Sequence, residues 1–233
     1  MLSVYRPAID SIKPLNFFIM GTIRNGANGG FSGKAGSVIG SSWNDISYIK
    51  GLPKLSNKPA SLKQLDQRAR FAAVLQYLAP IKDMLILGFK GQNAGRATGF
   101  NMGIQHAIIN AVTGTYPDYQ VDKALVQISR GTLQKPGSVV VASTVAGALE
   151  LSWLPQVNNL NAFASDTLVA LLYNEEQSLF LSYTDVATRQ AGTATIAIPT
   201  DFSGQTVHAY FFYIKEDGSR QSISIYQGPT TII

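Results

Sequence analysis

The chain has 233 residues, 45% of them hydrophobic, so it is long enough to bury a sizeable core as one large or two small domains. It contains no cysteine, which excludes disulfides, thiolate nucleophiles, iron–sulfur clusters and cysteine-ligated zinc. The net charge of +5 is unevenly spread: residues 1–131 carry 15 basic and 6 acidic side chains, whereas residues 132–233 carry 4 and 8, and this indicates two parts with different surroundings.

The first 19 residues are the least defined part of the sequence. The apolar run over residues 15–20 is too short to span a membrane. Asp10 and Pro14 interrupt this region, and no cleavage site typical of a signal peptide follows. We expect residues 1–19 to be a leader and Met20 to be an alternative start of translation. Because no signal peptide or membrane span is recognised, the sequence favours a cytoplasmic or virion-associated protein.

Six glycines lie among small residues over residues 25–43. Glycine at this density is typical of a backbone that takes positive φ or approaches another group closely. No hydrophobic period holds here, so we expect an ordered loop or extended arm, followed by a short strand over residues 43–50.

A phosphate-binding loop is the first function that these glycines suggest, and their spacing argues against it. A Walker A loop needs a glycine five residues before its Gly-Lys pair and Ser or Thr after it. Gly33-Lys34 has Asn28 and Ala35 at those positions, and no G-x-G occurs in the stretch. We therefore predict no cofactor and an interface role, with these candidate residues: Gly29, Gly30, Phe31, Gly33, Lys34, Gly36, Gly40 and Trp43.

Three helices are predicted in the middle of the chain. Ser61 and Gln64 have the spacing of a capping box, and apolar residues recur at helical intervals from Leu62 to Leu78. Pro80 suits the first turn of a second helix. A third helix is expected over residues 100–112, with Gly114 at its C-terminal cap. A turn over residues 116–118 and a strand over residues 121–129 follow.

The pattern changes beyond Thr132 to short runs rich in β-branched and aromatic residues. We predict strands over residues 138–143, 148–153, 167–173, 178–183, 192–198, 207–214 and 222–226, with hairpin turns at 174–176 and 216–218. Seven such strands are typical of an immunoglobulin-like or fibronectin-type sandwich, with Trp153 in its core. The predicted fold is therefore α+β: a leader (1–19), a glycine-rich arm plus helices (20–131) and an antiparallel β-sandwich (132–233).

Residue types that carry catalysis are sparse. His106 and His208 are the only histidines, and neither has a neighbour at metal-ligand spacing. The acidic pairs Glu175-Glu176 and Glu216-Asp217 fall in predicted turns, where solvated carboxylates are expected. No G-x-S-x-G nucleophile motif occurs. We predict no catalytic residues, no metal site and no enzymatic activity.

The basic part of the chain leaves two partners open. Residues 24–96 carry 11 basic and 3 acidic side chains interleaved with aromatic residues, as phosphate contact and base stacking would require. The same composition also fits a basic face that meets an acidic protein or a neighbouring copy. The candidate nucleic-acid contacts are Lys34, Lys50, Lys54, Arg68 and Arg70.

Residues 20–131 resemble an uncharacterised protein family associated with Bacteroidota genomes and their phages. The resemblance is carried by G-G-F-S-G-K-A-G-S-V-I-G-S-S-W over residues 29–43, Leu52-Pro53-Lys54, Q-R-A-R-F over 67–71, Gly88-Phe89, Phe100-Asn101 and T-G-T-Y-P over 113–117. It continues more weakly through 129–131 and 222–228. It implies a glycine-rich and helical part followed by a β-rich part, and no activity.

Together these patterns favour a non-enzymatic structural, assembly or interaction protein, which includes a phage virion component, that associates with itself or with a protein partner. The first alternative is a nucleic-acid-binding protein that uses its basic N-terminal half. The second is a carbohydrate- or surface-binding module that uses exposed aromatic residues of the sandwich.

Overall fold

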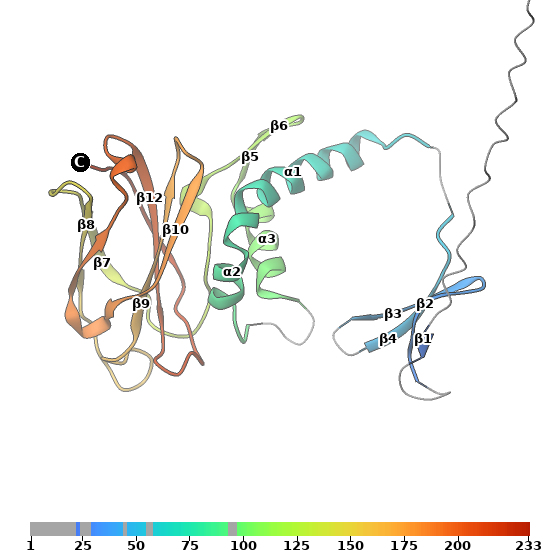
Figure 1. Cartoon of the computed structure of the whole chain (residues 1–233), viewed down its shortest axis with the longest axis horizontal. Helices are drawn as coiled ribbons and strands as arrows, with labels where there is room; N and C mark the ends of the chain where they lie inside the picture. Colours follow the sequence, from blue (N-terminus) through green and yellow to red (C-terminus); the bar gives the residue numbers. More distant parts are fainter. Residues whose placement is uncertain (1–21, 24–28, 44–45, 55–57, 93–96) are drawn as a thin grey trace, which may run out of the picture. The chain divides into compact units, whose positions relative to one another are not determined.

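The computed structural model describes residues 22–23, 29–43, 46–54, 58–92 and 97–233, and the predicted leader and alternative start lie outside them. The chain forms two compact units, residues 1–58 and 59–233. We had expected a division after Gly131, but the helices share the second unit with the β-sandwich (Figure 1).

The first unit is a four-stranded antiparallel sheet in the order β1-β2-β3-β4. Its strands are β1 (Thr22–Ile23), β2 (Phe31–Ala35), β3 (Val38–Trp43) and β4 (Ile46–Gly51). Of the predicted strand over 43–50, residues 46–50 lie in β4, Trp43 ends β3, and residues 44–45 lie outside the described residues. The predicted loop or extended arm is wrong, because the glycine-rich stretch forms β2 and β3. Gly36, with φ of 59°, lies in the turn that joins them.

The first helix begins where its predicted cap places it, and all three predicted helices occur. α1 (Leu62–Leu78) has the complete capping box: Gln64 N donates to Ser61 Oγ at 3.4 Å, and Ser61 N donates to Gln64 Oε1 at 3.0 Å. Pro80 lies in the 3-10 turn η1 (Ala79–Ile81) that leads into α2 (Lys82–Gly88). The third predicted helix is α3 (Gly99–Asn110), capped by Thr98.

The segment after α3 differs from the prediction. Gly114 does not cap α3, which ends at Asn110 with Ala111 as its C-cap. Gly114 lies instead, with φ of 94°, in a hairpin of β5 (Val112–Thr115) and β6 (Asp118–Val121). The predicted turn over 116–118 joins these two strands. The predicted strand over 121–129 is wrong: β6 ends at Val121 and the 3-10 turn η2 (Lys123–Leu125) follows, because Asp122 Oδ1 accepts from Ala124 N at 2.9 Å.

The sandwich consists of the sheets β11-β8-β7 and β10-β9-β12-β13, so the predicted α+β fold with an immunoglobulin/fibronectin-like sandwich is confirmed. All seven predicted strands occur; the last begins three residues later than predicted. The bounds are β7 (Gly137–Ala142), β8 (Ala148–Leu154), β9 (Thr167–Asn174), β10 (Leu179–Thr188), β11 (Thr193–Ala197), β12 (Thr206–Ile214) and β13 (Ile225–Thr231), with 3-10 turns η3 (Arg189–Ala191) and η4 (Thr200–Phe202).

Two hydrophobic clusters share strands β9 and β12. Leu168 and Phe211 belong to the cluster between the two sheets, which includes Trp153, as predicted. Leu171 and Phe212 belong to a second cluster, beneath α1, α2 and α3. Because alternate residues of a strand point to opposite faces, β9 and β12 are buried on both sides. The helices therefore form a third layer, packed on the β10-β9-β12-β13 sheet (Figure 1).

Candidate functional site

The β1–β4 sheet holds most of the residues that the sequence singled out, and its register places them. Lys34 of β2 pairs with Ile39 of β3, which pairs with Lys50 of β4. Directly paired residues share a face of a sheet, so the two lysines lie in one row on one face. The next rows on that face are Ser41 with Tyr48, and Trp43 with Ile46. We call this surface the lysine face; its members in β2–β4 are Lys34, Ile39, Ser41, Trp43, Ile46, Tyr48 and Lys50.

The opposite face accounts for two of the candidate glycines. A Cβ on Gly40 would lie 2.1 Å from the Phe31 carbonyl oxygen and 2.5 Å from its ring. A Cβ on Gly30 would lie 2.1 Å from Ser47 Oγ. Residues 30 and 31 therefore lie directly over β3 and β4, and the bend at Gly33, with φ of 105°, brings them there. Within the described residues these glycines accommodate the sheet's own chain, and we call this side the glycine face.

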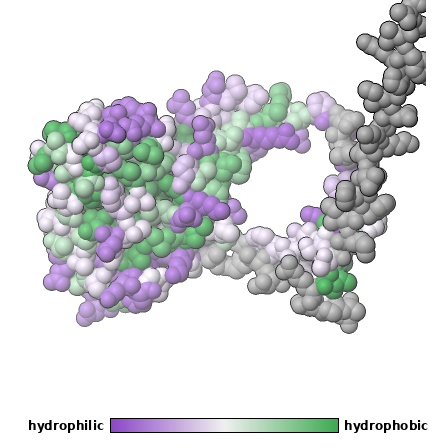
Figure 2. Space-filling model, viewed as in Figure 1, coloured by the Kyte–Doolittle hydropathy of each residue, from purple (hydrophilic) through white to green (hydrophobic). Residues whose placement is uncertain are grey.

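The sheet has no buried apolar side chain among its described residues. Instead, large apolar side chains are exposed on it: Trp43 is 45% exposed, Tyr48 44% and Ile49, on the glycine face, 65%. Figure 2 shows mostly pale side chains of intermediate hydropathy on the described part of this unit. A sheet this small needs cover on an apolar face to be stable, and the described residues leave these side chains roughly half exposed or more.

The five predicted nucleic-acid contacts are divided between the two units. Lys34 and Lys50 share the lysine face, and Lys54 is exposed after β4. Arg68 is exposed on α1, in the other unit. Arg70 has structural partners: its Nε lies 3.3 Å from Asp66 Oδ2, and its guanidinium lies over the Tyr119 ring at 4.9 Å. Tyr119 of β6, which also donates a hydrogen bond to Asp66 Oδ1, holds the β5–β6 hairpin against α1 through these two residues.

A second feature, which the sequence did not predict, is an open groove of about 400 Å³ between α1, β6 and the β9–β10 turn. Its apolar side is an aromatic cluster in which the Tyr77 ring centroid lies 5.0 Å from that of Tyr173 and 5.2 Å from that of Phe180. Its polar side includes Lys123 and Glu175. Sequence reasoning treated Glu175 as a solvated turn residue.

Glu175 instead joins three elements. Its Oε1 accepts from Lys123 Nζ at 2.5 Å, and its Oε2 lies 3.1 Å from His208 Nε2. Lys123 and then His208 lower the pKa of the Glu175 carboxyl, so it stays ionised. His208 Nδ1 lies 2.7 Å from the Tyr226 hydroxyl. Burial raises the pKa of Tyr226, so this Tyr–His–Glu chain favours a protonated phenol over an activated nucleophile.

Burial dominates the surroundings of two further titratable sites of the second unit. The Asp166–Arg189 pair is fully buried, with Arg189 Nη2 2.9 Å from Asp166 Oδ2 and the guanidinium 3.8 Å above the Tyr213 ring. Burial lowers the pKa of His106, and Arg130 lowers it further. No group of three or more His, Asp or Glu side chains suited to a metal occurs in the described ranges.

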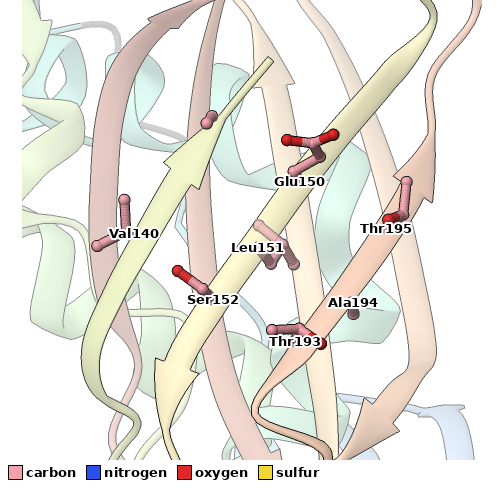
Figure 3. Close-up of a pocket in the computed structure, with 8 residues that line it drawn as sticks. Val140, Glu150, Leu151, Ser152, Thr193, Ala194 and Thr195 are labelled. Atoms are coloured by element: carbon pink, nitrogen blue, oxygen red, sulfur yellow. The ribbon is translucent and has the colours of Figure 1, made fainter. Parts of the chain in front are cut away.

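The outer face of the β11-β8-β7 sheet has a shallow hollow of about 340 Å³ (Figure 3). Register places Val140, Ser152 and Thr193 in one cross-strand row, and Glu150 and Thr195 in the next. Small and β-branched side chains line it, and Glu150 is its only charged group. Four of its lining side chains are polar, namely Glu150, Ser152, Thr193 and Thr195, but the hollow lies on an open sheet face, whereas small-molecule sites are typically deeper and mostly apolar.

One helical stretch, Leu62–Gly88, is long and apolar enough to cross a membrane by length and composition. Val74, Leu78 and Leu85 in this stretch are fully buried in the cluster beneath the helices. A core helix passes the same test of length and composition, and the absence of a membrane span stays a prediction.

Three comparisons relate the chain to known proteins. The model of a family of unknown function, DUF6266, matches residues 30–228. No curated protein matches. The fn3 domain of human collagen alpha-1(XX) chain is similar over 43% of this chain and 88% of that one, with 15% identity and a TM-score of 0.32. The fn3 domain of human contactin 1 is similar over 45% and 83%, with 9% identity and a TM-score of 0.27. At these TM-scores neither domain indicates a function.

Proposed function

This chain belongs to the family of unknown function DUF6266, so we propose its function from its own residues. We propose that it is a non-enzymatic structural or interaction protein that assembles through the β1–β4 sheet. The observation that carries the proposal is the lack of any buried apolar side chain in the described part of that sheet. In this proposal the second unit, with its two hydrophobic clusters, is the stable domain to which the β1–β4 sheet is linked.

The partner we propose for the glycine face is a second copy of the chain. Gly30 and Phe31 of the same chain lie against Ser47 and Gly40 on this face. Ile49 and Ser42 stay exposed beside them, and no charged residue of β2–β4 points to this face. An uncharged surface with an exposed isoleucine at its edge can pack on a copy of itself without burying unpaired charge. A role in a phage virion is the finer form of this proposal, and it rests on the sequence resemblance.

Size-exclusion chromatography with light scattering tests the proposal. We expect the wild-type chain to associate with rising concentration, and Ile49→Asp to shift it towards monomer because a carboxylate would be buried in the contact. Ile109→Asp is the matched control: Ile109 is 71% exposed on α3, outside the sheet, and should leave association unchanged. A wild-type chain that stays monomeric at high concentration would contradict self-assembly.

A further inference from the structure

The lysine face combines two lysines with two exposed aromatic rings. From this combination we propose that it binds single-stranded nucleic acid, with Lys34 and Lys50 contacting phosphates and Trp43 and Tyr48 stacking on bases. Stacking on aromatic rings beside a basic track is the general mode by which proteins hold single strands. The proposal goes beyond self-assembly, because it uses the opposite face of the sheet.

The charge of the chain supports an anionic partner at this unit. Residues 1–58 contain seven basic and two acidic residues, a net charge of +5, whereas residues 59–233 contain twelve of each. The entire net charge of the protein therefore belongs to the unit that holds the sheet. Lys34 and Lys50 are the only charged residues in the strands β1–β4, so no carboxylate of these strands neutralises them.

The register sets the spacing between the groups. Lys34 and Lys50 are separated by two strand spacings, about 10 Å. Tyr48 is two residues from Lys50 along β4, about 7 Å away on the same face. Trp43 is the diagonal neighbour of Tyr48 across β3 and β4, at about 7–8 Å between backbones. Two aromatic rings thus lie beside a row of two lysines. A nucleic-acid single strand whose bases are unstacked from one another can contact both.

The aromatic rings favour a single strand over the other anionic partners. A duplex would meet the lysines with its phosphates, but its bases are stacked on one another and cannot reach the rings. An acidic protein would pair with the lysines and leave the roughly half-exposed rings of Trp43 and Tyr48 without a specific role. Only an unpaired strand uses both kinds of side chain.

Fluorescence anisotropy with a labelled oligothymidylate tests this inference. We expect binding that weakens as salt rises from about 50 to 200 mM, with a log–log slope of about −0.7 for each phosphate neutralised. Lys34→Gln/Lys50→Gln should flatten that slope by about 1.4. The matched control, Lys82→Gln/Lys135→Gln, removes two exposed lysines of the other unit and should leave the slope unchanged.

Intrinsic fluorescence gives a second readout. The chain has two tryptophans, and Trp153 is buried in the sandwich core, so quenching by a stacked base reports on Trp43. Trp43→Phe should abolish the quenching but keep binding, because a ring remains. Trp43→Ala should weaken binding by about 5- to 150-fold, the range for losing one stacked base.

Four outcomes would overturn the proposal: no binding at low salt, equal slopes for the two double variants, a duplex that binds as tightly as the single strand, or displacement by polyglutamate as effective as by unlabelled oligonucleotide. The last would assign the face to an acidic protein. Ile49→Asp, which tests self-assembly on the glycine face, should still bind the oligothymidylate, so failure of one proposal is distinguishable from failure of the other.

Discussion

The two units of this protein place their apolar side chains in opposite ways. Residues 59–233 bury them in two clusters on either side of β9 and β12. The described strands of residues 1–58 bury none, and Trp43 and Ile49 face outward. Burial of apolar area is the main stabilising contribution to folding. The second unit therefore has two hydrophobic cores to stabilise it, whereas the described residues of the first unit form none.

The largest change in the free energy of unfolding is expected from a substitution in the buried ion pair of the second unit. Asp166→Ala leaves the Arg189 guanidinium in the core without its carboxylate, and Arg189 is 1% exposed. Removing one partner of a buried pair costs about 3–5 kcal/mol in free energy of unfolding. Denaturant unfolding followed by fluorescence measures it well, because Trp153 Nε1 donates to the Arg189 carbonyl at 2.9 Å.

Two variants control this experiment. Asp185→Ala removes an exposed carboxylate from β10 and should change the free energy of unfolding little. Asp166→Ala/Arg189→Met removes both charges and should recover part of the stability lost in the single variant. If Asp166→Ala unfolded at the same denaturant concentration as the wild type, the pair would not contribute to the stability of the second unit.

A smaller effect is expected in the first unit, where close backbone packing replaces a core. Gly40→Ala forces a Cβ against the carbonyl oxygen of Phe31, and backbone atoms cannot rotate away as a side chain can. Overpacking of this kind costs about 1–3 kcal/mol. We expect faster proteolysis within residues 29–54 and unchanged unfolding of residues 59–233.

Gly51→Ala is the matched control, because a Cβ there would meet nothing within 4 Å. It should leave the rate of proteolysis unchanged. Equal cleavage of both alanine variants would mean that the packing of residues 30 and 31 over β3 and β4 does not hold the first unit together.

The sequence predicted those elements whose signals are local. Ser61, Gln64 and Pro80 fix helix starts through neighbours a few residues away, and the sandwich strands are separated by turn residues. The strands β2 and β3 were missed because glycine and serine fill positions where alternating apolar residues would reveal a strand. The uninterrupted apolar run L-V-A-L-L at residues 168–172 could have predicted that this strand is buried on both faces of its sheet.

The candidate sites depend on pairings that no local pattern contains. Lys34 and Lys50 share a face only because both strands pair with β3 in one register, and a shift of one residue would turn one of them to the other face. Glu175 meets Lys123 and His208 from distant parts of the chain. Sequence reasoning identified both lysines but could not place them together, and it assigned the carboxylate to solvent.

The smallest effect on stability is expected at Glu175, a half-exposed residue at the surface of the second unit. Lys123 and His208 lower the pKa of this carboxyl from its ordinary 4.5, so its ion pair stabilises the fold above that pH and is lost as the pH falls through the lowered value. Because the side chain is 49% exposed, solvent screening limits the contribution to about 0.2–1 kcal/mol.

Glu175→Gln should therefore lower the free energy of unfolding at neutral pH, and the wild-type and variant curves should converge in acid as the wild-type carboxyl is protonated. Denaturant unfolding across this pH range measures the difference, with Glu216→Gln, a change at an exposed turn residue, as the control. A difference that stayed constant down to the lowest pH would assign the effect to the shape of the Glu175 side chain. The charge that links β9 to η2 and β12 would then contribute nothing to the stability of the groove.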